Sequence, residues 1–131
     1  MPFQSYAKGA GSSEHKRGNV MRVLVAFEEE YRTYQDVTAN IIRELRPHVE
    51  VSVAGLDELE TQVARLLPGL VICSRSKNSM DADGAYAWLK LPTGHGRTAE
   101  LCVNEECSEV VELGLEELLR ILDEIEMLIR A

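Results

Sequence analysis

The stretch Met21-Arg-Val-Leu-Val-Ala-Phe27, which runs into three glutamates at positions 28 to 30, decides the fold of this chain. Its continuous apolar run is typical of a strand that is covered on both faces. Leu70-Val-Ile-Cys73 has the same character and runs into Ser74-Arg75-Ser76-Lys77. If these strands are adjacent and parallel, their carboxyl ends meet at the sheet edge where open α/β sheets bind ligands. We therefore expect the acids and Ser74 to meet in a crevice there.

The segment between these two runs alternates between helical and strand-like spacing. Thr33 and Asp36 are a candidate capping pair for a helix that Pro47 closes. Residues 49–53 then predict a second strand, and Asp57 can cap a second helix that ends before the next strand. Two strand-helix-strand crossovers of this length predict a parallel sheet of order 2-1-3 with right-handed connections.

The pattern changes after Ser74. Residues 75–85 are rich in polar residues and glycine and predict a loop rather than a helix. A strand is predicted over residues 86–91, and a β-hairpin joins residues 101–103 to 110–111. We expect these later strands to be antiparallel.

A final amphipathic helix is predicted from a cap at Gly114 to about Arg130. Its apolar residues cover more than the usual core face, which leaves two interpretations open. The helix either packs deeply in a single core or also packs on a second copy of the chain. The candidate interface residues are Leu118, Ile121, Ile125 and Leu128.

Size and composition favour one domain without metal or disulfide crosslinks. The chain has 131 residues, of which we expect 1–20 to be a flexible tail and 21–131 a single domain. The fold class predicted is α/β: a three-layer open sheet with a parallel half, antiparallel hairpin strands and the C-terminal helix. A net charge of −8 argues against direct nucleic-acid binding. No apolar stretch approaches the roughly 20 residues of a membrane helix.

Cysteine usage predicts a reducing compartment. The chain has three cysteines and no apolar leader of the secretory type, so we expect reduced thiols in the cytoplasm. Cys73 lies in an apolar strand and is predicted to belong to the core. Cys102 and Cys107 flank the hairpin turn and could pair as a disulfide, but their Cys-x4-Cys spacing is not the redox Cys-x-x-Cys signature. Incidental reduced thiols are therefore the favoured interpretation.

Residues 21–77 resemble a response-regulator receiver domain, which has a flavodoxin-like fold. Arg22-Val-Leu-Val-Ala-Phe-Glu-Glu29 is similar to the first strand with its acidic cluster, and Pro68-Gly-Leu-Val-Ile-Cys-Ser74 to the strand that ends in the phosphorylated aspartate. The resemblance implies that the metal-holding acid pair falls on Phe27 and Glu28, with Glu29 just beyond. It also implies that the phosphoacceptor position falls on Ser74, so the chain lacks the acceptor aspartate.

Two functions follow as expectations. A serine hydroxyl is not ionised at neutral pH and needs an adjacent base, and no histidine is near Ser74 in the sequence. The resemblance then implies a non-phosphorylatable, non-enzymatic signalling or interaction module that binds a protein partner or a second copy. The alternative is a small-ligand- or metal-binding protein, or an enzyme, that uses the crevice. In it Glu28 or Glu29 would act as base or metal ligand, and Ser74 or Arg75 would orient an anion.

Acidic stretches are the candidate metal ligands. Glu28 and Glu29 could hold a divalent cation, with Mg²⁺ the first choice, although the run also suits a helix N-terminus. Asp81-Ala-Asp83-Gly84 resembles part of a calcium loop but lacks the distal glutamate, which favours an acidic turn. No other cofactor is predicted.

Overall fold

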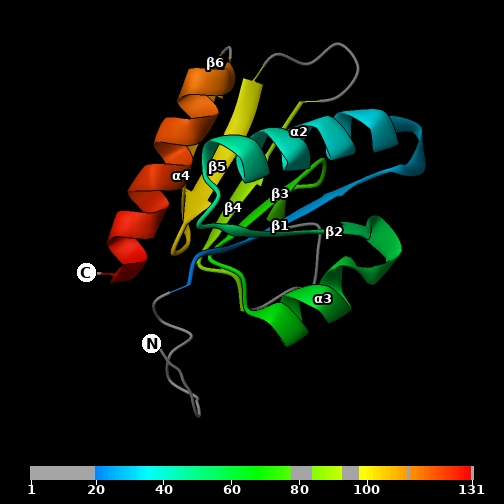
Figure 1. The fold of residues 1–131 in the computed structure, drawn as a ribbon, viewed down its shortest axis with the longest axis horizontal. Helices are drawn as coiled ribbons and strands as arrows, with labels where there is room; N and C mark the ends of the chain where they lie inside the picture. The colour runs from blue at the N-terminus through cyan, green and yellow to red at the C-terminus, as the bar shows by residue number, and fades with distance from the viewer. Residues whose placement is uncertain (1–19, 78–83, 93–97, 112, 131) are drawn as a thin grey trace.

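The structure is a computed structural model that describes residues 20–77, 84–92, 98–111 and 113–130. It shows an α/β fold with a six-stranded mixed open sheet of order β2-β1-β3-β4-β5-β6 (Figure 1). Residues 1–19 of the expected tail and most of the Asp81–Gly84 segment lie outside the described residues. The strands are β1 (Arg22–Phe27), β2 (Glu50–Gly55), β3 (Leu70–Cys73), β4 (Ala87–Lys90), β5 (Thr98–Val103) and β6 (Glu106–Val111), and the helices are α2 (Arg32–Leu45), α3 (Leu59–Leu66) and α4 (Leu115–Arg130).

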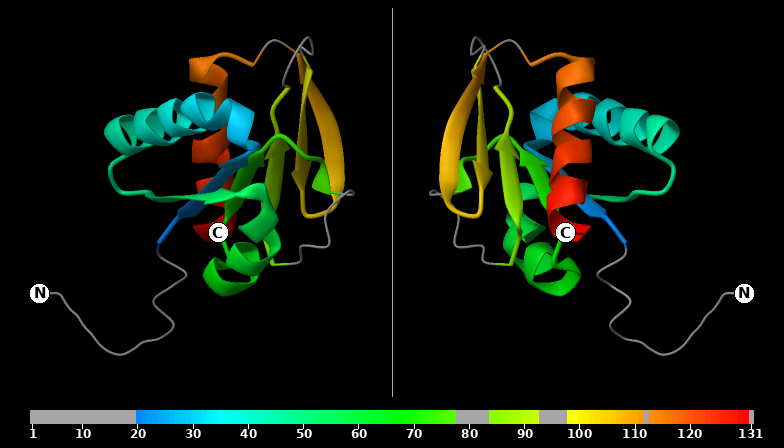
Figure 2. Two further views of the ribbon diagram at one scale, coloured as in Figure 1. Left: turned by 90° about the vertical axis from the view of Figure 1, so that its right-hand side faces the viewer. Right: turned by 90° about the vertical axis from the view of Figure 1, so that its left-hand side faces the viewer.

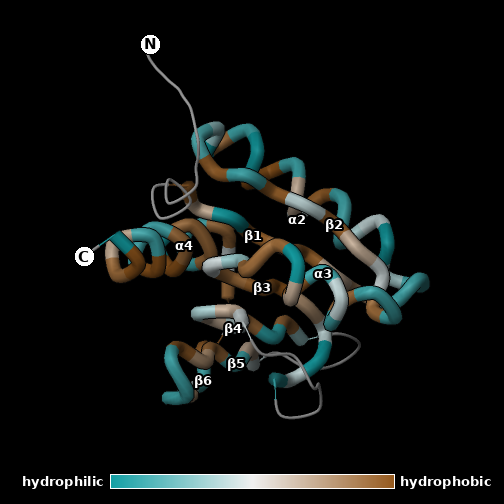
Figure 3. The backbone as a smooth tube through the Cα atoms, turned by 90° about the horizontal axis from the view of Figure 1, so that it is seen from below, coloured by the Kyte–Doolittle hydropathy of each residue, from teal (hydrophilic) through white to brown (hydrophobic). Residues whose placement is uncertain are grey.

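The parallel half of the sheet has β1 at its centre. β1 pairs in parallel with β2 on one side and with β3 on the other, which confirms the predicted order 2-1-3. Every residue of β3 is buried, as the continuous apolar run predicted. Most of β1 and β3 is hydrophobic, as the colouring of Figure 3 shows.

β4 corrects the prediction that all later strands are antiparallel. It pairs in parallel with β3, and the antiparallel part of the sheet begins only at β5. The reason is visible in its burial: Trp88 packs on one face of the sheet and Ala87 and Leu89 on the other. Such double coverage is typical of an interior parallel strand. The sequence did not signal a parallel connection because no helical pattern follows β3.

β5 and β6 form the predicted hairpin, at the sheet edge opposite β2 (Figure 2). A two-residue turn of Asn104 and Glu105 joins them, with φ angles of 50° and 76°. Positive φ at both central residues matches the right-handed twist of the strands and is the usual geometry of a two-residue hairpin.

Cys102 and Cys107 are joined by a disulfide, so the favoured expectation of reduced thiols is wrong for this pair. The two residues are direct partners in the β5–β6 register, with their Cα atoms 4.0 Å apart. Side chains of directly opposed residues point to the same face of a sheet, which brings the two sulfur atoms together. Sequence spacing alone did not decide between pairing and free thiols.

Two hydrophobic clusters lie on opposite faces of the sheet. Along β1, Val23, Val25 and Phe27 belong to one cluster, whereas Leu24 and Ala26 belong to the other. Residues of α2 and α4 complete the first cluster, and residues of α3 complete the second. The alternation follows from the two-residue period of a strand, and Figure 1 shows the helices in these positions.

The helix starts differ from the predicted caps. α2 is preceded by a 3-10 turn, Glu29–Tyr31, and its N-cap residue Tyr31 makes no side-chain capping bond. Thr33 and Asp36 lie inside the helix, so the predicted capping pair is wrong. The acids after β1 already turn the chain, since the Tyr31 amide donates to the Glu28 carbonyl at 2.8 Å. The helix therefore begins before the residues that resemble a cap.

The second helix shows the same effect. Asp57 lies in a 3-10 turn, Leu56–Glu58, and the N-cap residue of α3 makes no side-chain capping bond, so the predicted Asp57 cap is wrong. By contrast, the Gly114 carbonyl accepts from the Leu118 amide at the start of α4, as predicted. No helix in the described ranges is long and apolar enough to cross a membrane.

Candidate functional site

The candidate site lies at the carboxyl ends of β1 and β3. The Ser74 hydroxyl donates a hydrogen bond of 2.6 Å to a carboxylate oxygen of Glu28. The parallel register, in which Ala26 is the partner of Cys73, brings the residues after the two strands together. The predicted meeting of an acid with Ser74 is confirmed.

Glu28 is an ionised carboxylate in this site. Burial raises its pKa, but the hydrogen bond from Ser74, one from its own backbone N–H and the nearby Arg75 guanidinium together outweigh burial. The pKa of Glu28 is therefore below its usual value, which argues against the alternative in which Glu28 acts as a base. A carboxylate of lowered pKa is a poor base for a serine hydroxyl, which argues against a nucleophilic serine.

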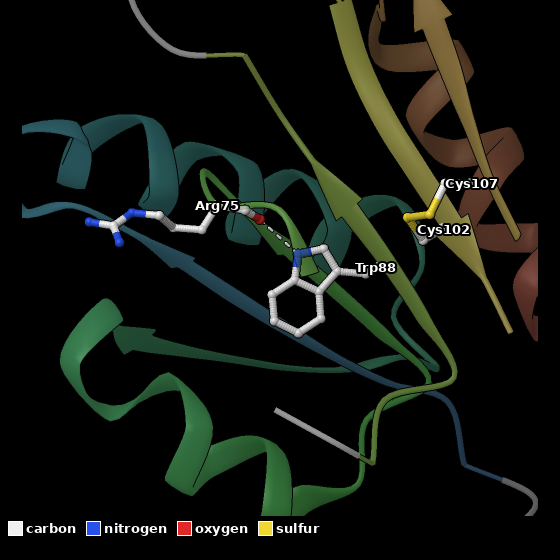
Figure 4. The surroundings of a disulfide bond; sticks show 4 residues. All are labelled: Arg75, Trp88, Cys102 and Cys107. Carbon is white, nitrogen blue, oxygen red and sulfur yellow. Dashed lines mark hydrogen bonds between the residues drawn. A yellow bond between two sulfur atoms is a disulfide. The ribbon is translucent and has the colours of Figure 1, made fainter. Parts of the chain in front are cut away.

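Arg75 is held at its backbone by the protein interior. Its carbonyl accepts from the Trp88 indole at 2.8 Å, as Figure 4 shows. It also accepts from the Cys73 thiol at 3.0 Å. Its guanidinium is half exposed and lies 3.6 Å from a Glu28 carboxylate oxygen. Burial raises the pKa of the Cys73 thiol to about 12, so this cysteine is a neutral core residue, as predicted. The site thus has one cation on a fixed backbone.

A cleft of about 830 Å³ opens beside this cluster. The end of β1 and the start of α2 form one side of the cleft. The end of β2 and the turn that follows it form the other side. Its lining contains more acids than bases and no histidine or cysteine. The lining residues are Phe27, Glu28, Glu29, Arg32, Gln35, Val53, Ala54, Gly55, Leu56, Asp57, Glu58 and Arg75.

Gln35 is a site residue that the sequence analysis missed. Its side chain is only 8% exposed and lines the cleft. The Oε1 atom accepts from the Phe27 amide at 2.9 Å, while the Nε2 amide has no hydrogen-bond partner in the described part of the chain. A signal was present, since Gln35 shares the buried face of α2 with Ala39 and Ile42. A polar residue on such a face needs partners.

The acids after β1 do not gather into a metal-binding group. Glu29 has an almost fully exposed side chain and pairs with Arg32 at 3.5 Å. Phe27, at the position implied for a metal-holding acid, is 2% exposed and belongs to the core. Among the described residues, the group of three potential ligands within 4.8 Å of one another is Glu100, Cys102 and Cys107.

The structure separates the predicted interface residues of α4. Leu118, Ile121 and Ile125 are 7%, 2% and 2% exposed and belong to the core. Leu128 is 51% exposed, next to Met127 at 71%. The two adjacent exposed apolar side chains near the C-terminal end of α4 are therefore the remaining candidate interface on this helix.

No family model and no curated protein sequence matches this chain. The site itself therefore carries the functional inference. It combines an ionised carboxylate, a serine hydroxyl already donated to that carboxylate, one cation and a buried amide donor beside a cleft. Such a set can bind a polar molecule, but it contains no nucleophile paired with an effective base.

Proposed function

We propose that this protein is a receiver-like signalling or protein-interaction module that is not phosphorylated. The observation that carries the proposal is the hydrogen bond between Ser74 and Glu28 at the end of β3. At the position where a receiver would bear an aspartate, the chain has a hydroxyl that is donated to the neighbouring acid. An acyl phosphate forms only on a carboxylate, so Ser74 cannot replace the aspartate as its acceptor.

Three further features support this proposal. The parallel order 2-1-3 agrees with the receiver-like half that we infer, and helices on both faces of the sheet support a three-layer arrangement. Phe27 replaces an acid that would help to hold Mg²⁺, so the metal needed to offset phosphoryl charge would be poorly held. We also infer a cytoplasmic location, where a partner protein would bind.

The test is incubation with acetyl phosphate and Mg²⁺, followed by intact-mass measurement before and after hydroxylamine. The expected result is an unchanged mass, with a phosphorylation-competent receiver as the positive control. An acyl phosphate that hydroxylamine removes from the wild-type protein would contradict the proposal.

The proposed surface for a protein partner or a second copy is the C-terminal end of α4. Met127 and Leu128 are exposed apolar neighbours there. Sedimentation at micromolar concentration should show a dimer that Leu128→Glu dissociates. Leu45→Glu is the matched control, because Leu45 is 46% exposed but lies on α2. A wild-type protein that sediments only as a monomer would remove the second copy as a partner.

A small-ligand-binding function is the second candidate, and the Gln35 amide, which has no partner among the described residues, favours it. A buried donor without a partner costs roughly 1–3 kcal/mol, a cost that a ligand acceptor would offset. Gln35 and Arg75 would bind an anionic group, and Glu28 and Asp57 would accept from ligand hydroxyls. This chemistry suits a phosphorylated or carboxylated polyol such as a nucleotide.

A thermal-shift screen with nucleotides, flavins, metals and small acids tests this second function. Gln35→Glu keeps an oxygen for the Phe27 amide but removes the amide donors, so it should abolish any shift. Gln62→Glu is the control, because Gln62 is a surface residue of α3 that accepts from Arg65. Flat shifts across the whole screen would count against ligand binding.

A further inference from the structure

One face of the β5–β6 hairpin gathers three metal-ligating side chains outside the cleft. Glu100, Cys102 and Cys107 each place a potential ligand atom within 4.8 Å of the other two. Cys107 is exposed, Glu100 is partly buried and Cys102 is 3% exposed. The cluster is therefore open to solvent on one side and supported by the core on the other.

The strand register explains why these three residues meet. Cys102 and Cys107 are direct partners across the hairpin. Glu100 precedes Cys102 by two residues on the same strand, so both side chains point to the same face. This face also carries Trp88, the register partner of Cys102 on β4, and Figure 4 shows its indole and the disulfide.

The charges around Glu100 favour a bound cation. Glu109 lies directly opposite Glu100 on β6, and like charges in this position repel each other. Lys90 lies opposite Glu100 on β4, yet no ion pair of Glu100 is found among the residues described. Two thiolates would add further negative charge at the same place.

We propose that the reduced hairpin binds one thiophilic divalent cation, such as Zn²⁺, through the sulfur atoms of Cys102 and Cys107 and the carboxylate of Glu100. A dithiol reductant supplies two electrons and two protons, the S–S bond breaks, and the reductant becomes a disulfide. Binding of the cation then displaces both thiol protons. A water molecule completes the tetrahedral coordination that Zn²⁺ prefers.

Oxidation state controls this site. In the disulfide the sulfur atoms are bonded to each other and cannot act as thiolate ligands, so the oxidised hairpin has only Glu100 to offer. Thiolate ligands select Zn²⁺ over Mg²⁺ or Ca²⁺, which prefer oxygen. The proposal is independent of the function of the cleft, because the two sites share no residue.

Metal titration of the full chain tests the proposal. The protein is reduced with a phosphine, and the phosphine is removed without air. Zn²⁺ is titrated against a chromogenic chelator, and Co²⁺ is followed by its thiolate charge-transfer absorption. Trp88, the only tryptophan of the chain, reports binding through quenching by Co²⁺. We expect one metal per reduced chain and none per oxidised chain, with circular dichroism showing that both forms are folded.

Single substitutions identify the ligands. Cys102→Ser and Cys107→Ser should each abolish the charge-transfer band. Glu100→Gln should weaken Zn²⁺ binding by at least the roughly 10- to 100-fold that loss of an outer-shell partner costs. Glu106→Gln is the matched control, because Glu106 precedes Cys107 but points to the other face of β6. Cys73→Ala should bind as the wild type does.

Three results would each overturn the proposal. The first is that the reduced wild-type protein binds Zn²⁺ no better than Cys102→Ser does. The second is that the oxidised protein binds Zn²⁺ as tightly as the reduced protein. The third is a stoichiometry of one metal per two chains. A Glu100→Gln variant with wild-type affinity would remove the carboxylate from the ligand set.

Discussion

At the scale of single residues, the functional inference depends on the hydroxyl of Ser74. The hydroxyl is 2.6 Å from the Glu28 carboxylate, and Ser74 itself is 8% exposed. Hydrogen bonds to a charged group are stronger than those between neutral groups. The pair therefore fixes both the charge of Glu28 and the inertness of Ser74.

Replacing Ser74 by alanine should raise the pKa of Glu28, because one of the interactions that lower it is lost. The pKa of Glu28 in the folded protein is below its usual value. The ionised carboxylate therefore contributes its full stabilisation at any pH above that usual pKa. The contribution is lost as the pH falls through the folded-state pKa. NMR titration of the Glu28 carboxyl carbon checks the direction.

The same substitution should cost about 1 kcal/mol of unfolding free energy at neutral pH, the typical net value of one hydrogen bond. A double-mutant cycle with Glu28→Gln isolates the pair from other effects. If Ser74→Ala and Glu28→Gln are additive, Ser74 does not act through Glu28.

At the scale of elements, an ion pair ties the chain after α2 to α4. Arg46 donates two hydrogen bonds, each of 2.8 Å, to the two carboxylate oxygens of Asp123. His48 lies 2.9 Å from Glu126, one turn further along the same helix. The planar guanidinium matches the carboxylate with two parallel bonds, which lysine cannot do.

Arg46→Lys should therefore lower the thermal midpoint and raise the pKa of Asp123, which the Arg46 hydrogen bonds hold below its usual value. The stability from Asp123 is present above its usual pKa and is lost as the pH falls through the lowered value. Thermal unfolding across acidic pH measures both effects. Arg120→Lys is the control, because Arg120 pairs only with residues of α4 in the described structure.

The hairpin disulfide closes a very short loop. Cys102 and Cys107 are five residues apart, so loop-closure entropy predicts a contribution of about 2 kcal/mol. We expect the Cys102→Ser/Cys107→Ser protein to remain folded but to unfold at lower urea concentration by this amount. Hydrogen exchange should locate the added opening in β5 and β6, and protection lost evenly across the sheet would contradict this local role.

At the scale of the whole molecule, α4 is part of the core through most of its length. Leu122 is fully buried against the sheet, whereas Leu128, less than two turns later, is 51% exposed. Together with α2, the helix therefore covers one face of the sheet, and its exposed C-terminal end is available to another protein.

Leu122→Ala should destabilise the protein by roughly 2–5 kcal/mol, the range for creating a cavity in a core. Leu128→Ala should change stability by about 0.5 kcal/mol or less. Urea unfolding of the two variants at low protein concentration measures the difference. Equal losses of unfolding free energy in the two variants would contradict the burial of Leu122 and the exposure of Leu128.

The local sequence determined most of the parallel half of the sheet. Continuous apolar runs predicted β1 and β3, and helical spacing with proline stops predicted the helices between them. These features are local, because the period of the hydrophobic residues and the backbone restriction at proline depend only on neighbouring residues in the chain. The meeting of Glu28 with Ser74 followed from the rule that parallel strands end at one edge.

Only the tertiary structure decided the direction of β4, the disulfide and the position of Gln35, whose amide nitrogen meets no partner in the described ranges. Each depends on which strands and residues pair: β4 lies parallel to β3, and the register of the β5–β6 hairpin places Cys102 directly opposite Cys107. Gln35 is a site residue because its Oε1 atom accepts from the Phe27 amide and its side chain lines the cleft. Hydrophobic patterns report whether a side chain is buried, but not which polar group it meets there.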